Sequence, residues 1–223
     1  MADFDASLEE GIAYERRLDW EGALRHYDSL LGAVEEAANR NPSAQSRLSS
    51  AQVRRGNALM VLRRMDEARQ AFDSGLHAAK AAGDPLVLAR ALMAAGVFAG
   101  TSGDASLAER FLLDALDRFS RIPGAEGEQG AGWALLNLGG IYGKTGRLDL
   151  AFVTLEKSRE RLHAIENWVG VAAAWEAQAQ LRRAIGDEDR WREDLAEAVV
   201  FYDREGMREK TDQLRAILKG KLL

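Results

Sequence analysis

The three histidines of this chain are its most versatile candidates for site chemistry, because an imidazole can act as a base or bind a metal. His26, His77 and His163 are far apart in the sequence, and no serine, carboxylate or second histidine recurs beside them in a fixed pattern. A nucleophile needs a base within hydrogen-bond reach, and a metal needs several converging ligands. We therefore expect the histidines to be surface or capping residues, and we expect no catalytic residue and no metal site.

The run Gly143-Lys144-Thr145 ends like a phosphate-binding loop. That motif requires another glycine five positions before Gly143, on a turn between a strand and a helix, so that backbone amides surround the phosphates. Position 138 is Leu instead, and the segment has the pattern of one helix that ends before another begins. The run therefore predicts a turn and not a nucleotide site.

Arginines are dense in one stretch of the first third of the chain. The ordinary interpretation is a solvated helix face paired with nearby acids, which contributes little free energy. The alternative is a basic patch that binds an acidic protein partner. Nucleic acid is a less suitable ligand, because no aromatic residues are interleaved with the arginines. The group consists of Arg47, Arg54, Arg55, Arg63, Arg64 and Arg69.

The composition is that of an ordinary helical protein. The 223 residues contain 30 Lys and Arg against 35 Asp and Glu, for a net charge of -5. An acidic balance argues against nucleic acid or a membrane surface as a ligand, since both attract a basic protein. The absence of cysteine excludes disulfides and thiolate chemistry and fits a reducing compartment. Residues 1–10 show no secretory pattern, and no run approaches a membrane span, so we expect a cytoplasmic protein.

A spacing that recurs five times indicates the elements that would position these residues. A small residue is followed twelve positions later by a second small residue, and a bulky residue stands four positions after that. Two helices that cross at close range need small residues where their backbones meet and large ones beside the crossing, so the spacing predicts five helix-turn-helix repeats. The first positions are Gly11, Gly56, Gly96, Gly139 and Ala179; the second are Ala23, Ala68, Ala108, Ala151 and, as an exception, Trp191; the bulky residues are Tyr27, Phe72, Leu112, Leu155 and Leu195.

Helix breakers fall where such repeats would turn. Asn41-Pro42 and Asp84-Pro85 each place a capping side chain before a proline that suits the first helical turn. Gly103-Asp104 and Gly186-Asp187 pair a helix stop with a new cap inside repeats three and five. The pattern predicts about ten helices of roughly 15 to 20 residues, in pairs and without strands.

The segment Gly124–Gly132 holds four glycines in nine residues and follows a proline. Such a composition suits a mobile connector or a frayed helix start, and we interpret it as a solvated loop. The alternative is a hinge that lets repeats four and five swing.

The last residues, 207–223, place Leu214, Ile217 and Leu218 at helical spacing. A stack of repeats exposes an apolar face at each end, and a final helix can cover it. We expect a C-terminal capping helix there.

These repeats resemble the tetratricopeptide repeat, whose small and aromatic positions are best matched by Leu138-Gly139, Tyr142 and Ala151 of repeat four. The period of about 42 residues exceeds the standard 34 and is similar to the long-repeat variety of kinesin light chains and bacterial regulators. The resemblance implies an all-α fold, a right-handed α-solenoid of about five repeats near residues 4–40, 42–83, 84–122, 126–166 and 167–206. Because Trp191 replaces a small residue, we expect a looser or re-angled last pair.

The resemblance also implies that the first helix of each pair lines a concave groove. The residues that would face it lie one position after the marker glycine and about a turn to either side. Several could instead be core between adjacent pairs, above all Met93, Val97 and Leu136. The predicted ligand-binding residues are Arg54, Asn57, Arg90, Met93, Val97, Trp133, Asn137 and Lys144.

The function that the resemblance implies is a protein-interaction module that binds a peptide segment or an amphipathic helix in this groove. The alternative is a peptide-responsive regulatory domain that acts on a separate effector. We expect no enzymatic activity and no cofactor, and a monomer or weak homodimer. The sequence does not identify the partner or the pathway.

Overall fold

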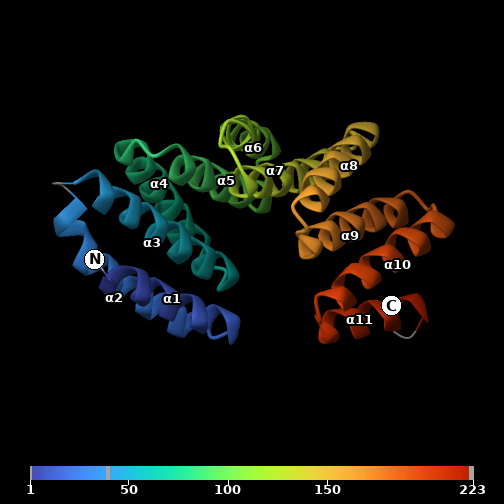
Figure 1. Ribbon diagram of the computed structural model, residues 1–223, viewed down its shortest axis with the longest axis horizontal. Coiled ribbons are helices and arrows are strands. Elements are labelled where there is room, and N and C mark those ends of the chain that lie inside the picture. The colour runs from blue at the N-terminus through green and yellow to red at the C-terminus, as the bar shows by residue number, and fades with distance from the viewer. Residues whose placement is uncertain (1, 39–40, 221–223) are drawn as a thin grey trace. The chain divides into compact units, whose positions relative to one another are not determined.

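The computed structural model describes residues 2–38 and 41–220, and every regular element within these ranges is a helix (Figure 1). The helices follow one another with short turns between them. Their bounds are α1 Ala2–Arg16, α2 Trp20–Ala38, α3 Pro42–Val61, α4 Met65–Ala82, α5 Pro85–Thr101, α6 Ala105–Ser120, α7 Ala125–Lys144, α8 Leu148–Ala164, α9 Trp168–Ala184, α10 Glu188–Arg204 and α11 Arg208–Leu218. The predicted all-α solenoid of paired helices with a last capping helix is confirmed.

The chain divides into two compact units, one up to Ala115 and one from Leu116 onward, so that the boundary falls inside α6. In the first unit α1 packs on α2, α3 on α4, and α3 also on α5. In the second unit α7 packs on α8, α9 on α10, and α7 also on α9. Within each unit, therefore, the first helices of consecutive pairs lie side by side.

The predicted helix crossings are confirmed by the surroundings of the marker glycines. A Cβ atom built on each glycine would lie within 3.0 Å of the bulky residue predicted beside the crossing. The helices therefore approach closely only because these positions lack a side chain. The pairs are Gly11 with Tyr27, Gly56 with Phe72 (2.9 Å), Gly96 with Leu112 (2.8 Å) and Gly139 with Leu155 (2.6 Å).

The predicted helix starts are capped as the sequence indicated. The side chain of Asn41 accepts a hydrogen bond from the Ser43 amide, and that of Asp84 accepts from the amide of Leu86. Asp104 and Asp187 cap α6 and α10 in the same way. These bonds satisfy amides that the first turn of a helix leaves without a partner.

The segment 124–132 is not a solvated loop, so this prediction was wrong. Residues from Ala125 onward form the first turns of α7, and the glycines at 127, 130 and 132 are buried. Cβ atoms at Gly130 and Gly132 would overlap the ring of Phe119 and the side chain of Leu162. Glycine is used here for close packing inside a helix, and the connector consists only of residues 121–124.

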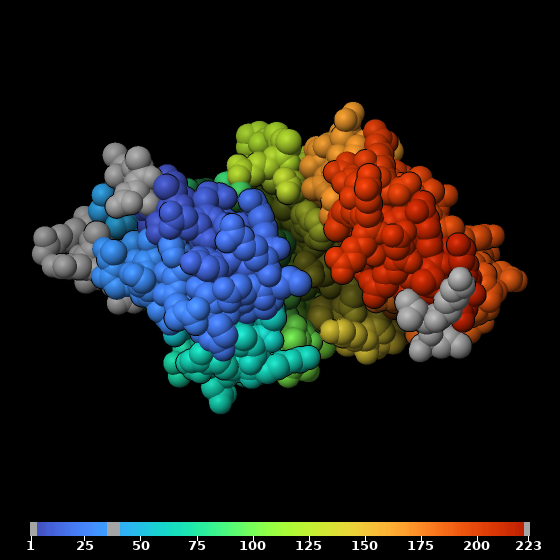
Figure 2. Space-filling view, turned by 90° about the horizontal axis from the view of Figure 1, so that it is seen from below, coloured from blue at the N-terminus to red at the C-terminus, as the bar shows by residue number. Residues whose placement is uncertain are grey.

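The end of the chain is covered as predicted. Leu214 of α11 is buried in a cluster with Tyr202 and Leu195 of α10, and Figure 2 shows α10 and α11, at the red end of the colour scale, as one closely packed surface. Trp191 is only 7 % exposed in the same cluster, with Ala179 beside it, so α9 and α10 accommodate the large ring in their shared core. No helix in the described part of the chain is long and apolar enough to span a bilayer.

Candidate functional site

The eight predicted ligand-binding residues occupy one angular sector of three helices, α3, α5 and α7. A helix turns roughly 100° per residue. Measured from the glycine at the crossing, all eight lie between about 60° and 160° around their own helix. None of them is buried. The sector therefore points away from the partner helix of each pair and keeps contact with solvent.

In the first unit α3 packs beside α5, and Asn57 occupies the same sector of α3 as Arg90, Met93 and Val97 occupy of α5. Val61 belongs to the same sector of α3 and is 46 % exposed. We call these five residues the α3–α5 stripe. Trp133, Asn137 and Lys144 occupy the same sector of α7 in the second unit.

The predicted residues Arg54, Arg90 and Asn137 each interact with another residue of the fold. Arg54 Nη1 donates to Oε2 of Glu15 at 2.9 Å, and the Tyr27 hydroxyl donates to the other oxygen of that carboxylate at 2.7 Å. Asn137 Nδ2 donates to the backbone carbonyl of Trp133, one turn earlier. Burial raises the pKa of the Tyr27 hydroxyl, and the bond to Glu15 raises it further.

The other arginines of the first unit confirm the ordinary interpretation of their density. Arg55 pairs with Asp28 at 2.6 Å, and Arg64 pairs with Glu67 at 2.6 Å. Arg69 lies over the ring of Phe98. Five of the six arginines thus have an acid or a ring of their own unit as a partner, which favours the ordinary interpretation.

His26 and the run that ends in Thr145 each have a structural contact. His26 Nε2 donates to the backbone carbonyl of Ser7 at 2.6 Å. The run that ends in Thr145 is the C-terminus of α7, where the threonine hydroxyl donates to the carbonyl of Ile141. Helix C-termini present carbonyl oxygens, which repel phosphate. Within residues 2–38 and 41–220, no three metal-ligating side chains converge on one point.

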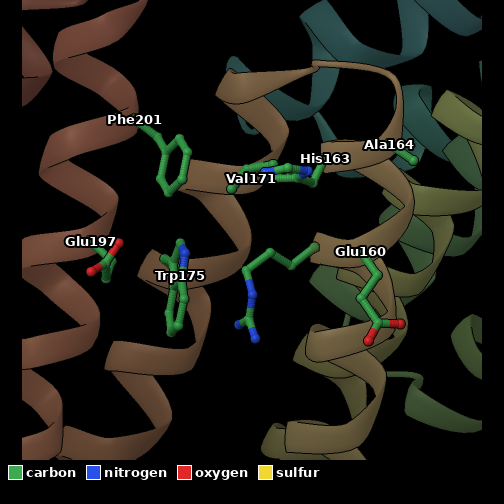
Figure 3. A pocket seen from close by; sticks show the side chains of 8 residues that line it. Glu160, His163, Ala164, Val171, Trp175, Glu197 and Phe201 are labelled. Carbon is green, nitrogen blue, oxygen red and sulfur yellow. The ribbon is translucent and has the colours of Figure 1, made fainter.

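A recess in the second unit was not predicted. It has a volume of about 450 Å³ and lies between α8 and α10 over α9 (Figure 3). We call it the α9 recess. It is lined by Arg159, Glu160, His163 and Ala164 of α8, by Val171 and Trp175 of α9, and by Glu197 and Phe201 of α10.

The rings around the α9 recess hold one another in place. Trp168 stacks on Phe201 with ring centroids 5.8 Å apart and planes 13° apart. His163 meets Trp168 edge-on at 4.9 Å. The guanidinium of Arg204 lies 3.8 Å from the centre of the Trp168 ring. The aromatic wall is therefore held by contacts within the second unit.

Further along α9 the same side of the helix becomes polar. Gln178 donates to the carboxylate of Asp194 at 3.0 Å, and Arg182 reaches Asp187 at 3.1 Å and the ring of Phe152 at 4.2 Å. Burial raises the pKa of Asp194, although the bond from Gln178 and the charge of Arg182 act in the opposite direction. This network fastens α9 to α10 and does not open into the α9 recess.

The sequence contains a pattern on α9 that relates to the α9 recess but is not part of the repeat spacing. Trp168, Val171, Trp175, Gln178 and Arg182 recur every three or four positions and so share one face of α9. Apolar residues with this period usually indicate core. What turns part of the face into a recess is the separation of α8 from α10, which the sequence does not state.

The fold is found in solved structures over the whole chain. It is similar to BtubC (BKLC) from P. vanneervenii, with 18% identity and a TM-score of 0.62 over 100% of this chain and 92% of that one. A kinesin light chain protein from Podosopora anserina with nearly identical TPR-like repeats has 13% identity and a TM-score of 0.65 over 91% and 96%. A Rap protein complexed with competence and sporulation factor has 13% identity and a TM-score of 0.55 over 99% and 75%.

The sequence itself matches no protein-family model and no curated protein. At 13 to 18% identity the likeness to the solved structures establishes the fold alone. Function has to be argued from the α3–α5 stripe and the α9 recess.

Proposed function

We propose that this chain, whose fold is that of the tetratricopeptide repeats, is a non-enzymatic module that binds a peptide segment or amphipathic helix of another protein. The observation that carries the proposal is the α3–α5 stripe. It joins the exposed side chain of Val61 and the partly buried side chains of Met93 and Val97 to an amide and a cation on two helices that lie side by side.

The chemistry of the stripe suits a peptide better than a small metabolite. Met93 is flexible and polarisable, so it adapts to an apolar side chain of a ligand. The amide of Asn57 can hydrogen-bond an extended backbone, and Arg90 can pair with a carboxylate. Trp133 and Lys144 offer the same combination on α7 and are candidate contacts for a ligand of the same class.

A direct test is isothermal titration with a partner purified after capture from the source cells. We expect the variant Asn57→Ala/Arg90→Glu to bind about tenfold more weakly or worse, because one ligand hydrogen bond is lost and one charge is reversed. The loss should shrink at high salt for an acidic ligand. The melting temperature should stay close to that of the parent, because partly exposed polar side chains contribute little to folding.

The matched control is Gln70→Ala/Lys80→Glu, which makes the same two kinds of change on exposed positions of α4. It should bind like the parent. Full affinity in the Asn57→Ala/Arg90→Glu variant would exclude the α3–α5 stripe as the binding surface, whatever the partner is.

A second candidate function is a peptide-responsive regulatory domain. The observation that favours it is the likeness in fold to a Rap protein that was solved with competence and sporulation factor. Small-angle scattering with and without the captured ligand separates the two functions. A change in the radius of gyration on binding supports regulation, and an unchanged radius supports a plain binding module.

A further inference from the structure

The α9 recess has the dimensions of a ligand-binding site. Its volume of about 450 Å³ falls within the range of ligand sites in proteins, roughly 300 to 1,000 Å³. It opens on the side of α9 that faces α8 and α10, and it lies entirely within the second unit. It is therefore a different site from the α3–α5 stripe.

The recess contains two aromatic rings, those of Trp175 and Phe201, and both are held by neighbouring side chains. Trp175 lies under the guanidinium of Arg159, whose Cζ is 3.8 Å from the ring centre. The same guanidinium donates to Gln178 at 3.3 Å. Phe201 is held by its stack on Trp168. An aromatic ligand would gain stacking and edge contacts without first ordering these side chains, which lowers the entropy lost on binding.

The charges at the rim select the sign of the ligand. Glu160 on α8 and Glu197 on α10 stand on opposite walls (Figure 3), and neither carboxylate has an ion pair within the described part of the chain. The cation of the recess, Arg159, is engaged by Trp175 and Gln178 and is also 3.9 Å from Glu156. His163, the remaining titratable group of the lining, packs on Trp168. Among the lining residues, the charges without an ion pair are thus both negative; Arg204, outside the lining, lies over the ring of Trp168.

We infer that the α9 recess binds a peptide segment of another protein that inserts one aromatic side chain between α8 and α10. Lys or Arg residues next to this aromatic side chain lie against Glu160 and Glu197. The apolar wall supplies the affinity, and the two carboxylates supply the preference for a basic segment.

The test uses three acetylated, amidated tripeptides on the full chain: Lys-Trp-Lys, Glu-Trp-Glu and Lys-Ala-Lys. Binding is followed by NMR through the indole N–H signals of the ¹⁵N-labelled protein, assigned with single Trp→Phe variants. We expect Lys-Trp-Lys to move the signals of Trp168 and Trp175 and to leave that of Trp20, in α2 of the first unit, in place. At about 20 mM salt it should bind roughly five to ten times more tightly than Glu-Trp-Glu, and this ratio should fall at about 500 mM salt.

Two variants locate the site. Ala164→Trp places an indole at an exposed position on the edge of the recess and should weaken Lys-Trp-Lys by about tenfold or more. Ala184→Trp is its control, because Ala184 is also exposed and also ends its helix, α9. Glu160→Gln/Glu197→Gln should abolish the preference for Lys-Trp-Lys over Glu-Trp-Glu while both still bind through Trp.

Three results would overturn the inference. Equal binding of Lys-Ala-Lys would show attraction by charge alone. Unchanged affinity of Ala164→Trp for Lys-Trp-Lys would show that the tripeptide binds elsewhere. If the Glu160→Gln/Glu197→Gln variant still prefers Lys-Trp-Lys over Glu-Trp-Glu as strongly as the parent, the two carboxylates do not cause the preference. None of these results bears on the α3–α5 stripe, which is tested with the captured partner and with residues of the first unit.

Discussion

The crossing of α7 and α8 at Gly139 allows a sharp test of the packing, because the neighbouring residue is also a glycine. A Cβ atom at Gly139 would lie 2.6 Å from Cγ and Cδ2 of Leu155, well inside van der Waals contact. A Cβ atom at Gly140 would have no heavy atom within 4 Å. Both positions are interior to the same helix, so Gly→Ala gains the same helix propensity at each, about 1 kcal/mol.

The difference between the two variants therefore isolates the cost of the close contact. Gly140→Ala should raise the free energy of unfolding by up to about 1 kcal/mol. The free energy of unfolding of Gly139→Ala should be about 1 to 3 kcal/mol lower than that of Gly140→Ala, since extra atoms in a packed crossing force the side chain or the backbone to shift. Urea unfolding followed by circular dichroism, with fluorescence as a second probe of whether unfolding is two-state, measures the gap.

A double-mutant cycle assigns the gap to one contact. Leu155→Ala alone should cost about 2 to 5 kcal/mol, because it leaves a cavity in the crossing. In that background Gly139→Ala should be neutral or stabilising, since the methyl group now enters free space; the coupling should exceed about 1 kcal/mol. If Gly139→Ala and Gly140→Ala unfold at the same urea concentration, the crossing is not where the marker spacing puts it.

Two further outcomes follow from buried hydroxyl groups. Burial raises the pKa of Tyr27 and Tyr202 above the usual 10.0, so the folded state keeps protons that the unfolded state releases; the free energy of unfolding should fall above about pH 10 by about 1.4 kcal/mol per pH unit for each tyrosine. Urea titrations at pH 9 and above should show a shallower fall in Tyr27→Phe and Tyr202→Phe, and an equally steep fall would contradict the assignment. Ser158 is buried and donates to a backbone carbonyl of α7 at 2.7 Å, so Ser158→Ala should lose about 1 kcal/mol in thermal or urea melts; a loss no larger than that of the exposed Ser74→Ala would show that the bond contributes nothing.

The prediction of segment 124–132 failed because glycine has two uses that composition does not separate. A glycine can break a helix by its conformational freedom, or it can let another element approach within a helix. Gly130 and Gly132 serve the second use, since Phe119 and Leu162 occupy the space where their side chains would be. The spacing of these glycines from a bulky partner residue, and not the number of glycines, would have indicated that they lie in a packed helix.

For the predicted binding residues, the sequence indicated their position on the helix but not their contacts. Their place on the sector of the first helices that is not buried followed from the marker glycines and the helical period. Whether a polar side chain on that sector is engaged depends on residues far away in the sequence. Arg54 is engaged by Glu15, 39 positions earlier, and no local pattern indicates this pair.

The sequence by itself determined the helices except the first turns of α7, their pairing, the capped starts of α3, α5, α6 and α10, and the last covering helix. These features depend on the 3.6-residue period, on caps and on small residues at a fixed separation, all of which act within one pair or between neighbours. Only the tertiary structure decided where a face of α9 remains uncovered. The α9 recess exists because α8 and α10 stand apart over Val171 and Trp175. That separation results from the packing of three helices at once, and no single segment encodes it.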